Sequence, residues 1–452
     1  MKKMAKVAAL LAAMVLTMAA FAQDFPSYLK MEGTVITGCD KDELPDNLVI
    51  PEGVTEIGDN AFSKCMYLES VVIPVSVKVI GKSAFSGCTS LKSVTIAGGV
   101  ETIGNYAFSG CMSLKSVTIA EGVEQIGDSM FNECVSLASI EIPVSVTAIG
   151  SSAFCYCMSL ASVTIPGSVK VIGKSAFSGC KSLKSVTLAE GVDTIGESMF
   201  NECTSLASIE IPESVTIIDE EAFYYCTSLA SVTIPESVTR IGRNAFVGCT
   251  SLASITIPEG LTAIGVGAFG GCMSLASIEI PASVTAIGVD AFGDCMSLAS
   301  IEIPTSVTAI GNYAFGGCTS LASIEIPASV TSIGEYAFRS SGLKTVTIPK
   351  SVKAISDGAF YDCKSLESVT IPRGVTKIGG HAFEDCTSLK SVSIPRSVTY
   401  ISVDAFKDCG NITIQYDGTK TQWVVIEKDW GASAVLPSIV RMATTKNKCG
   451  GN

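Results

Sequence analysis

Histidine is nearly absent from this chain of 452 residues, because His381 is the only one. A single imidazole excludes zinc sites built from several histidines and catalytic triads that use histidine as the base. The sequence shows no nucleophile–base pair, and His381 reads as an ordinary surface residue. We therefore expect no enzymatic activity, no cofactor and no metal site.

The chain also lacks any segment rich in lysine or arginine. It has 31 basic against 43 acidic residues, which gives a net charge of −12. Proteins that bind nucleic acids neutralise phosphates with basic side chains. The acidic balance therefore excludes a nucleic-acid partner of that kind.

Long apolar runs are missing except at the N-terminus. Three lysines precede the apolar residues 7–20, and Ala-Phe-Ala at 20–22 has the small-x-small pattern of a signal-peptide cleavage site. The apolar run is shorter than the ~20 residues that span a bilayer. We expect residues 1–22 to be a signal peptide for bacterial export. The mature chain is then secreted or on the cell surface, with no transmembrane segment.

The rest of the sequence is dominated by a repeat of 23 residues. Sixteen units follow one another from Pro51 to Pro395, with a single step of 22 residues before Pro349. The unit that begins at Pro281 reads PASVTAIGVDAFGDCMSLASIEI. With its proline counted as position 1, phenylalanine occupies position 12 in all sixteen units. A repeat this regular predicts a solenoid in which stacked units share one core.

Each unit contains two extended pieces and one turn. Apolar residues at positions 18, 21 and 23 predict a short strand, which the proline of the next unit ends. Positions 4 and 7 predict a second extended piece that points inward. We expect glycine at position 8 to permit a tight corner and Ala-Phe-x-x-Cys at 11–15 to form one helical turn. The sequence thus predicts a phenylalanine column, a cysteine ladder and ladders of isoleucine and leucine.

Fifteen of the eighteen cysteines occupy position 15, from Cys65 to Cys409. An odd number cannot pair completely, and neighbouring units hold these side chains parallel, whereas a disulfide needs converging Cβ vectors. We expect them to be small buried hydrophobic residues in the reduced state. Cys39, Cys155 and Cys449 lie off this ladder, and their pairing stays open.

These motifs resemble the BspA-like leucine-rich repeat family. The resemblance rests on L-x-x-L-x-L strands in 23-residue units ending in I-P, and on I-G-x-x-A-F-x-x-C, over residues 51–408. Residues 416–423 are similar to the Y-x-G-T-x-x-Q-W terminal segment of that family. The resemblance implies a β-rich, right-handed leucine-rich-repeat coil with short helical turns and a parallel sheet on the concave face.

Members of that family are exported surface proteins, and some are similar in role to adhesins. The resemblance implies a non-catalytic binding module whose ligand is a host extracellular-matrix protein or another microbial protein. A structural spacer or self-associating surface component without a specific ligand is the alternative.

The mature chain divides into three parts. Residues 23–50 read as an N-terminal cap, 51–416 as the solenoid of sixteen units, and 417–452 as a C-terminal cap and tail. Trp423 and Trp430 follow the last unit, where bulky rings can cover the open end of the core. A sugar- or partner-binding role for these two rings is the alternative.

The outward residues of the strand, at positions 20 and 22, are the first candidate binding face. They include Glu279, Glu302 and Glu325, with Ser277, Ser300 and Ser323. Adjacent strands lie ~4.8 Å apart, so the three carboxylates should form a like-charge ladder. No lysine or arginine occurs between Arg243 and Arg339. This pattern reads first as a solvated face with weak repulsion between like charges; a site for a basic protein partner, or one that attracts Ca²⁺, is the alternative.

The turn edge is the alternative binding face. Position 10 carries Tyr106, Tyr313 and Tyr336 there. Exposed tyrosine favours protein contacts, although single exposed aromatic side chains are also common.

Overall fold

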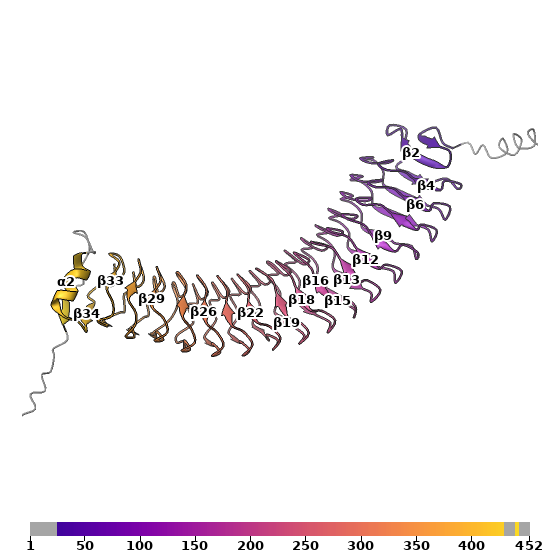
Figure 1. Ribbon diagram of the computed structural model, residues 1–452. Coiled ribbons are helices and arrows are strands. Elements are labelled where there is room, and N and C mark those ends of the chain that lie inside the picture. The colour runs from indigo at the N-terminus through magenta and orange to yellow at the C-terminus, as the bar shows by residue number, and fades with distance from the viewer. Residues whose placement is uncertain (1–24, 429–438, 443–452) are drawn as a thin grey trace, which may run out of the picture.

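The computed structural model describes residues 25–428 and 439–442. These residues form one curved row of stacked coils, with the first and last coils at opposite ends (Figure 1). The predicted signal peptide, Trp430 and Cys449 lie outside the described residues. Within them, no helix is long and apolar enough to cross a membrane.

The longer strand of most coils lies at about positions 20–23 and pairs in parallel with the same strand of the next coil, whereas the coil that begins at Pro304 has only a bridge at Glu325 there. Ser277 faces Ser300 and Glu279 faces Glu302, which is the register of identical positions. As far as Tyr416, buried residues alternate with more exposed ones along these strands. The longer strands are β3 (Asn47–Val49), β5 (Ser70–Ile73), β7 (Ser93–Ile96), β9 (Ser116–Thr118), β11 (Ser139–Glu141), β13 (Ser162–Ile165), β15 (Ser185–Leu188), β17 (Ser208–Glu210), β19 (Ser231–Thr233), β21 (Ser254–Ile255), β23 (Ser277–Glu279), β25 (Ser300–Glu302), β28 (Thr345–Thr347), β30 (Ser368–Thr370), β32 (Ser391–Ile394), β34 (Thr413–Tyr416) and β35 (Ile439–Met442).

A second row of two-residue strands lies at positions 6 and 7 and is also parallel. Ala286 faces Ala309 and Ile287 faces Ile310, again at identical positions. The short strands are β4 (Glu56–Ile57), β6 (Val79–Ile80), β8 (Thr102–Ile103), β10 (Gln125–Ile126), β12 (Ala148–Ile149), β14 (Val171–Ile172), β16 (Thr194–Ile195), β18 (Ile217–Ile218), β20 (Arg240–Ile241), β22 (Ala263–Ile264), β24 (Ala286–Ile287), β26 (Ala309–Ile310), β27 (Ser332–Ile333), β29 (Ala354–Ile355), β31 (Lys377–Ile378) and β33 (Tyr400–Ile401). The predicted parallel-strand solenoid is confirmed.

Phenylalanine rings stack along the core of the solenoid, as the repeat predicts. From Phe62 to Phe406, successive centroids are 5.1–5.9 Å apart and successive planes differ by 3–18°. Phe269 in the middle is fully buried, whereas Phe406 in the last unit is 7% exposed. Near-parallel offset rings at this distance attract one another beyond the burial of their area.

The segment around each phenylalanine is a series of tight turns rather than the expected helical turn. In the first coil, Cys65 N–H donates to the Phe62 carbonyl, while Phe62 N–H donates to Ala84 in the next coil. Asn60 and Lys64, at positions 10 and 14, have φ of 57° and 58°. A residue in this left-handed region cannot continue a right-handed helix. Neighbouring coils thus take the hydrogen bonds that a helix would use.

Glycine at position 8 has a different role from the one expected. Gly311 is not in the left-handed region, unlike the residues at positions 10 and 14. A Cβ on Gly311 would lie 2.5 Å from the carbonyl carbon of Gly288 in the preceding coil. The residue is therefore required by the close approach of two backbones and not by the corner itself.

The cysteine ladder is buried, and all seventeen cysteines in the described residues are free thiols. From Cys88 onward, each ladder Sγ donates to the main-chain carbonyl of the preceding coil's phenylalanine, as Cys295 does to Phe269 at 3.2 Å. Burial raises the pKa of the Cys134 thiol to about 12. Both features keep the ladder in the thiol form.

We expect thiol titration of the native protein to find few reactive groups, because the nucleophilic thiolate is suppressed by burial. After denaturation without a reductant, about fifteen or more thiols should react, because the ladder cysteines do not pair with one another. Cys155, which is buried but off the ladder, should behave like the ladder cysteines. Recovery of only a few thiols after denaturation would show that the ladder is oxidised.

The two ends of the core are covered differently. At the N-terminus, β1 (Leu29–Glu32) and β2 (Val35–Cys39) form an antiparallel hairpin, and β2 pairs in parallel with β4. At the C-terminus, α2 (Lys420–Lys428) carries Trp423, which is buried with its ring centroid 5.2 Å from that of Tyr416.

Candidate functional site

The three glutamates expected to form a ladder do lie on adjacent strands. Glu279 pairs with Glu302 in the strand register, and Glu302 forms a β-bridge with Glu325. All three side chains are exposed, as are Ser277, Ser300 and Ser323 beside them. No lysine or arginine pairs with any of the three glutamates in the described residues. Their negative charge therefore faces solvent without a neutralising partner.

The ladder belongs to a longer column, which we call the acidic strip. It comprises position 22 of six successive coils: Glu210, Thr233, Thr256, Glu279, Glu302 and Glu325. Glu210 pairs with Thr233, and Thr256 forms a bridge with Glu279. Five strand spacings of ~4.8 Å make the strip ~24 Å long, the length of about seven residues of extended peptide.

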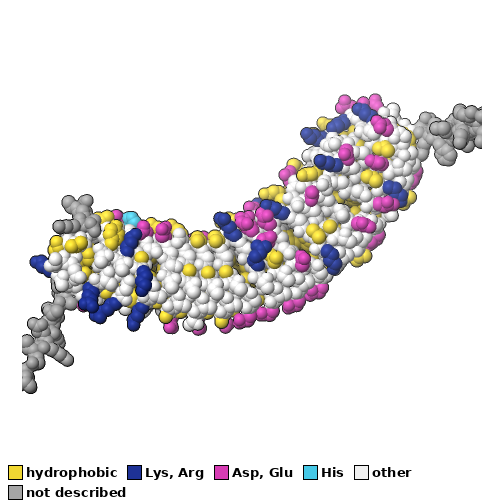
Figure 2. Space-filling model, in the orientation of Figure 1, with side chains coloured by type: hydrophobic (Ala, Val, Ile, Leu, Met, Phe, Trp, Pro, Cys, Tyr) yellow, Lys and Arg dark blue, Asp and Glu magenta, His cyan; other side chains and the backbone are white. Residues whose placement is uncertain are grey.

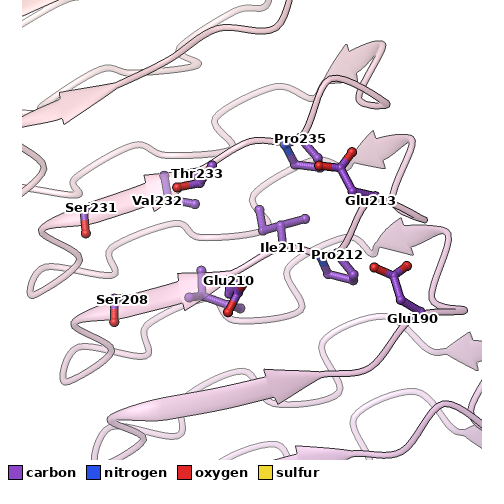
Figure 3. Close-up of a pocket in the computed structure, with 11 residues that line it drawn as sticks. Glu190, Ser208, Glu210, Ile211, Pro212, Glu213, Ser231, Val232, Thr233 and Pro235 are labelled. Atoms are coloured by element: carbon purple, nitrogen blue, oxygen red, sulfur yellow. The ribbon is translucent and has the colours of Figure 1, made fainter.

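A hollow lies at the end of the strip where Glu210 stands (Figure 3). Its volume is about 430 Å³, and Glu190 and Glu213 bring two more carboxylates to its corner side. The Glu190 carboxylate accepts a hydrogen bond from the Ser214 N–H at 3.1 Å. This site is not evident from the sequence, because Glu190 and Glu213 occupy position 2, on the far side of the proline from the strand.

Charge is distributed unevenly along the molecule (Figure 2). Acidic side chains follow one edge of the central coils, and basic side chains gather over the coils nearer the C-terminus. Between Arg243 and Arg339 there are seven acidic residues and no basic one, whereas residues 339–409 contain ten basic and seven acidic residues. Clustered charge of one sign next to the low-dielectric protein interior strengthens the electrostatic field over such a surface.

The turn edge carries a second hollow, of about 410 Å³, which we call the tyrosine hollow. It is lined by Tyr313, Tyr336, Arg339, Tyr361, His381 and Glu384. The rings of Tyr313 and Tyr336 are stacked with centroids 5.1 Å apart, and Tyr361 meets Tyr336 edge-on at 6.1 Å. Of the three candidate tyrosines, Tyr313 and Tyr336 are thus brought together, whereas Tyr106 lies nine coils away beside Lys82.

One carboxylate organises the charged side of the tyrosine hollow. Glu384 is buried and bonds to His381 Nδ1 and, at 2.8 Å, to Lys407 Nζ. Burial alone raises the pKa of this carboxyl, but hydrogen bonds from Lys407 and His381 bring the pKa below its ordinary value. Glu384 is therefore ionised at neutral pH and fixes the orientation of His381. Glu384 and Lys407 share position 13 of adjacent units, so the register of the repeat carried a signal for this pair, although His381 reads from the sequence as an ordinary surface residue.

Within the described residues, no group of three or more histidine, cysteine, aspartate or glutamate side chains is placed to hold a metal ion. The carboxylates of the acidic strip are spaced along a line and do not converge on one point.

Stacked 23-residue coils with parallel strands and columns of leucine, isoleucine, phenylalanine and cysteine define a leucine-rich-repeat solenoid, an architecture of repeat protein-interaction scaffolds. The chain belongs to the BspA-type leucine-rich repeat family. The family model for the BspA type leucine rich repeat region (6 copies) matches residues 44–160, 171–299, 216–327 and 285–413.

Two solved structures illustrate the likeness. A leucine-rich repeat protein from Bacteroides ovatus is 31% identical with a TM-score of 0.71, over 77% of this chain and 92% of that chain. A leucine rich cell surface protein from Faecalibacterium prausnitzii is 30% identical with a TM-score of 0.40, over 91% of this chain and 100% of that chain. No curated protein matches this chain.

Proposed function

We propose that this protein is an exported, non-catalytic adhesin, secreted or held at the cell surface. Its ligand is a host extracellular-matrix protein or a protein of another microbe. The acidic strip carries the proposal: four of its six positions are glutamates that face solvent in one register. Membership of the BspA-type family supports the same class of function.

The strip suits a ligand segment that is extended and basic. Side chains on neighbouring hydrogen-bonded strands form a straight row of carboxylates. The hollow at Glu210 has room for one larger side chain of the ligand. Each exposed ion pair contributes only about 0–1 kcal/mol, so affinity must come from several weak contacts in one row. A solenoid supplies such a row without any unique pocket.

Replacing Glu279, Glu302 and Glu325 together by glutamine should slow association roughly tenfold at low salt. Three exposed pairs at about 0.5 kcal/mol each sum to the free energy of a factor of ten. Dissociation should change less, because long-range steering acts on the encounter. Added salt should slow the wild type towards the variant, since the Debye length is only ~8 Å at physiological strength.

The experiment first identifies a ligand by capture from purified matrix proteins and from microbial surface proteins, and then measures binding kinetics. The control variant replaces Glu121, Glu124 and Glu133, three exposed glutamates on N-terminal coils, and should bind as the wild type does. Unchanged association of the strip variant at low salt contradicts the proposed face. Ordered self-assembly without any captured ligand favours the structural spacer.

The tyrosine hollow is the second candidate for the same binding function. It is favoured by the parallel stack of Tyr313 on Tyr336, next to the guanidinium of Arg339. Tyrosine and arginine are enriched among the residues that carry most of the binding energy of protein interfaces. If the strip variant binds normally, Tyr336→Ala is the next variant to measure.

A further inference from the structure

The cysteine ladder changes its bonding at its first member. Cys88, Cys111, Cys134 and the ladder cysteines as far as Cys318 each donate to the carbonyl of the phenylalanine 26 residues earlier. Cys65 belongs to the first unit, so no phenylalanine precedes it at that distance. The residue 26 positions earlier is Cys39, and its Sγ lies 3.4 Å from the Sγ of Cys65.

The geometry at this pair differs from that between ladder neighbours. Cys39 is the last residue of β2, in the antiparallel hairpin that covers the first coil, and it is not the position-15 residue of a preceding coil. Its side chain therefore approaches Cys65 from another backbone, and the parallel arrangement that opposes pairing along the ladder does not apply. Ladder thiols further along are engaged with carbonyls, as Cys88 is with Phe62 at 3.1 Å.

We propose that Cys39 and Cys65 form a disulfide that fastens the N-terminal hairpin to the first coil. A small-molecule disulfide is the oxidant. One cysteine thiolate attacks it and releases a thiol, and the second cysteine attacks the resulting mixed disulfide and releases another thiol. Two cysteine thiols are oxidised to one disulfide, one small disulfide is reduced to two thiols, and the two protons pass to the leaving thiolates.

The disulfide would fasten the hairpin to the first coil, which has a neighbouring repeat unit on one side only. Terminal repeats of a solenoid are stabilised from one side alone, so they open more readily than central repeats. Both thiols are buried, and the hydrogen bond to Cys65, together with burial, raises the pKa of Cys39. The disulfide therefore forms most readily while the hairpin is still docking, and reduction of the finished bond requires the hairpin to open.

The test is to refold the full chain with oxidised glutathione, alkylate free thiols under denaturing conditions and digest it with trypsin. Cleavage after lysine places Cys39 in peptide 31–41 and Cys65 in peptide 65–78, with no other cysteine in either. We expect these two peptides to be joined, and the count of free thiols to fall from eighteen to sixteen. Amide hydrogen exchange in β1 and β2 should slow on oxidation.

Two variants separate this pairing from others. Cys39→Ser should leave Cys65 alkylated and hydrogen exchange in β2 insensitive to the oxidant. Cys155→Ser, which replaces a cysteine of the same 8% exposure that is off the ladder, should leave the joined peptides in place. Alkylation of both Cys39 and Cys65 after oxidation overturns the proposal. A link between peptide 65–78 and peptide 83–92, which contains Cys88, overturns it equally.

Discussion

Phe269→Ala is expected to lower the free energy of unfolding by about 3–5 kcal/mol, because it leaves a cavity in a close-packed column. Phe269 is fully buried, with the rings of Phe246 and Phe292 at 5.6 and 5.7 Å on its two sides. The neighbours in the column are apolar rings, so a water molecule in the cavity would gain little. Equilibrium denaturation in urea or guanidinium measures the loss.

Phe406→Ala is the matched control for this effect. Phe406 is 7% exposed and has a single phenylalanine neighbour, Phe383, at 5.3 Å. The surrounding structure can relax more at the end of a solenoid, so the loss should be clearly smaller. Equal losses at Phe269 and Phe406 would contradict a solenoid stabilised by nearest-neighbour contacts.

Gly311→Ala is expected to destabilise the protein by about 1–3 kcal/mol or more, because the added carbon forces two backbones apart. The new Cβ would lie 2.5 Å from the Gly288 carbonyl carbon and 2.6 Å from the Val289 nitrogen. These are main-chain atoms held by inter-coil hydrogen bonds, so no side chain can rotate away. Chemical denaturation again gives the change in stability.

Gly196→Ala makes the same substitution at another glycine in position 8, where there is room for the added Cβ. Its added Cβ would meet only the Ile172 carbonyl oxygen, at 3.6 Å. This change should be neutral or stabilise by about 0.4–1 kcal/mol, because alanine has fewer unfolded conformations than glycine. A large loss at Gly196, or none at Gly311, would refute the role assigned to close approach.

Features that recur at one position of the unit could be predicted from the sequence. The phenylalanine column, the buried cysteine ladder and the registered glutamates Glu279, Glu302 and Glu325 all follow from stacking identical units. Each such residue meets its own counterpart in the next coil, so one unit suffices to predict the contact. The alternation of exposed and buried strand residues follows in the same way.

Contacts between different positions could not be predicted. In the tyrosine hollow, Tyr313, Tyr336 and His381 share position 10, but the contacts of Tyr336 with Tyr361 and of His381 with Glu384, both at position 13, require the path of the turn. The hollow at Glu190 and Glu213 depends on how the chain leaves the strand after the proline. Neither distance is set by the period of the repeat.

The sequence by itself determined that the chain is a solenoid, which residues form its core, and that the charge of its middle is acidic. Those properties depend on the period and on which residue types can be buried. Only the tertiary structure decided why position 8 is glycine, where the turns replace a helix, and that Cys39 meets Cys65. The first two features depend on the spacing between the backbones of adjacent coils. The contact of Cys39 with Cys65 depends on the irregular N-terminal hairpin, where the repeat no longer specifies which residues are neighbours.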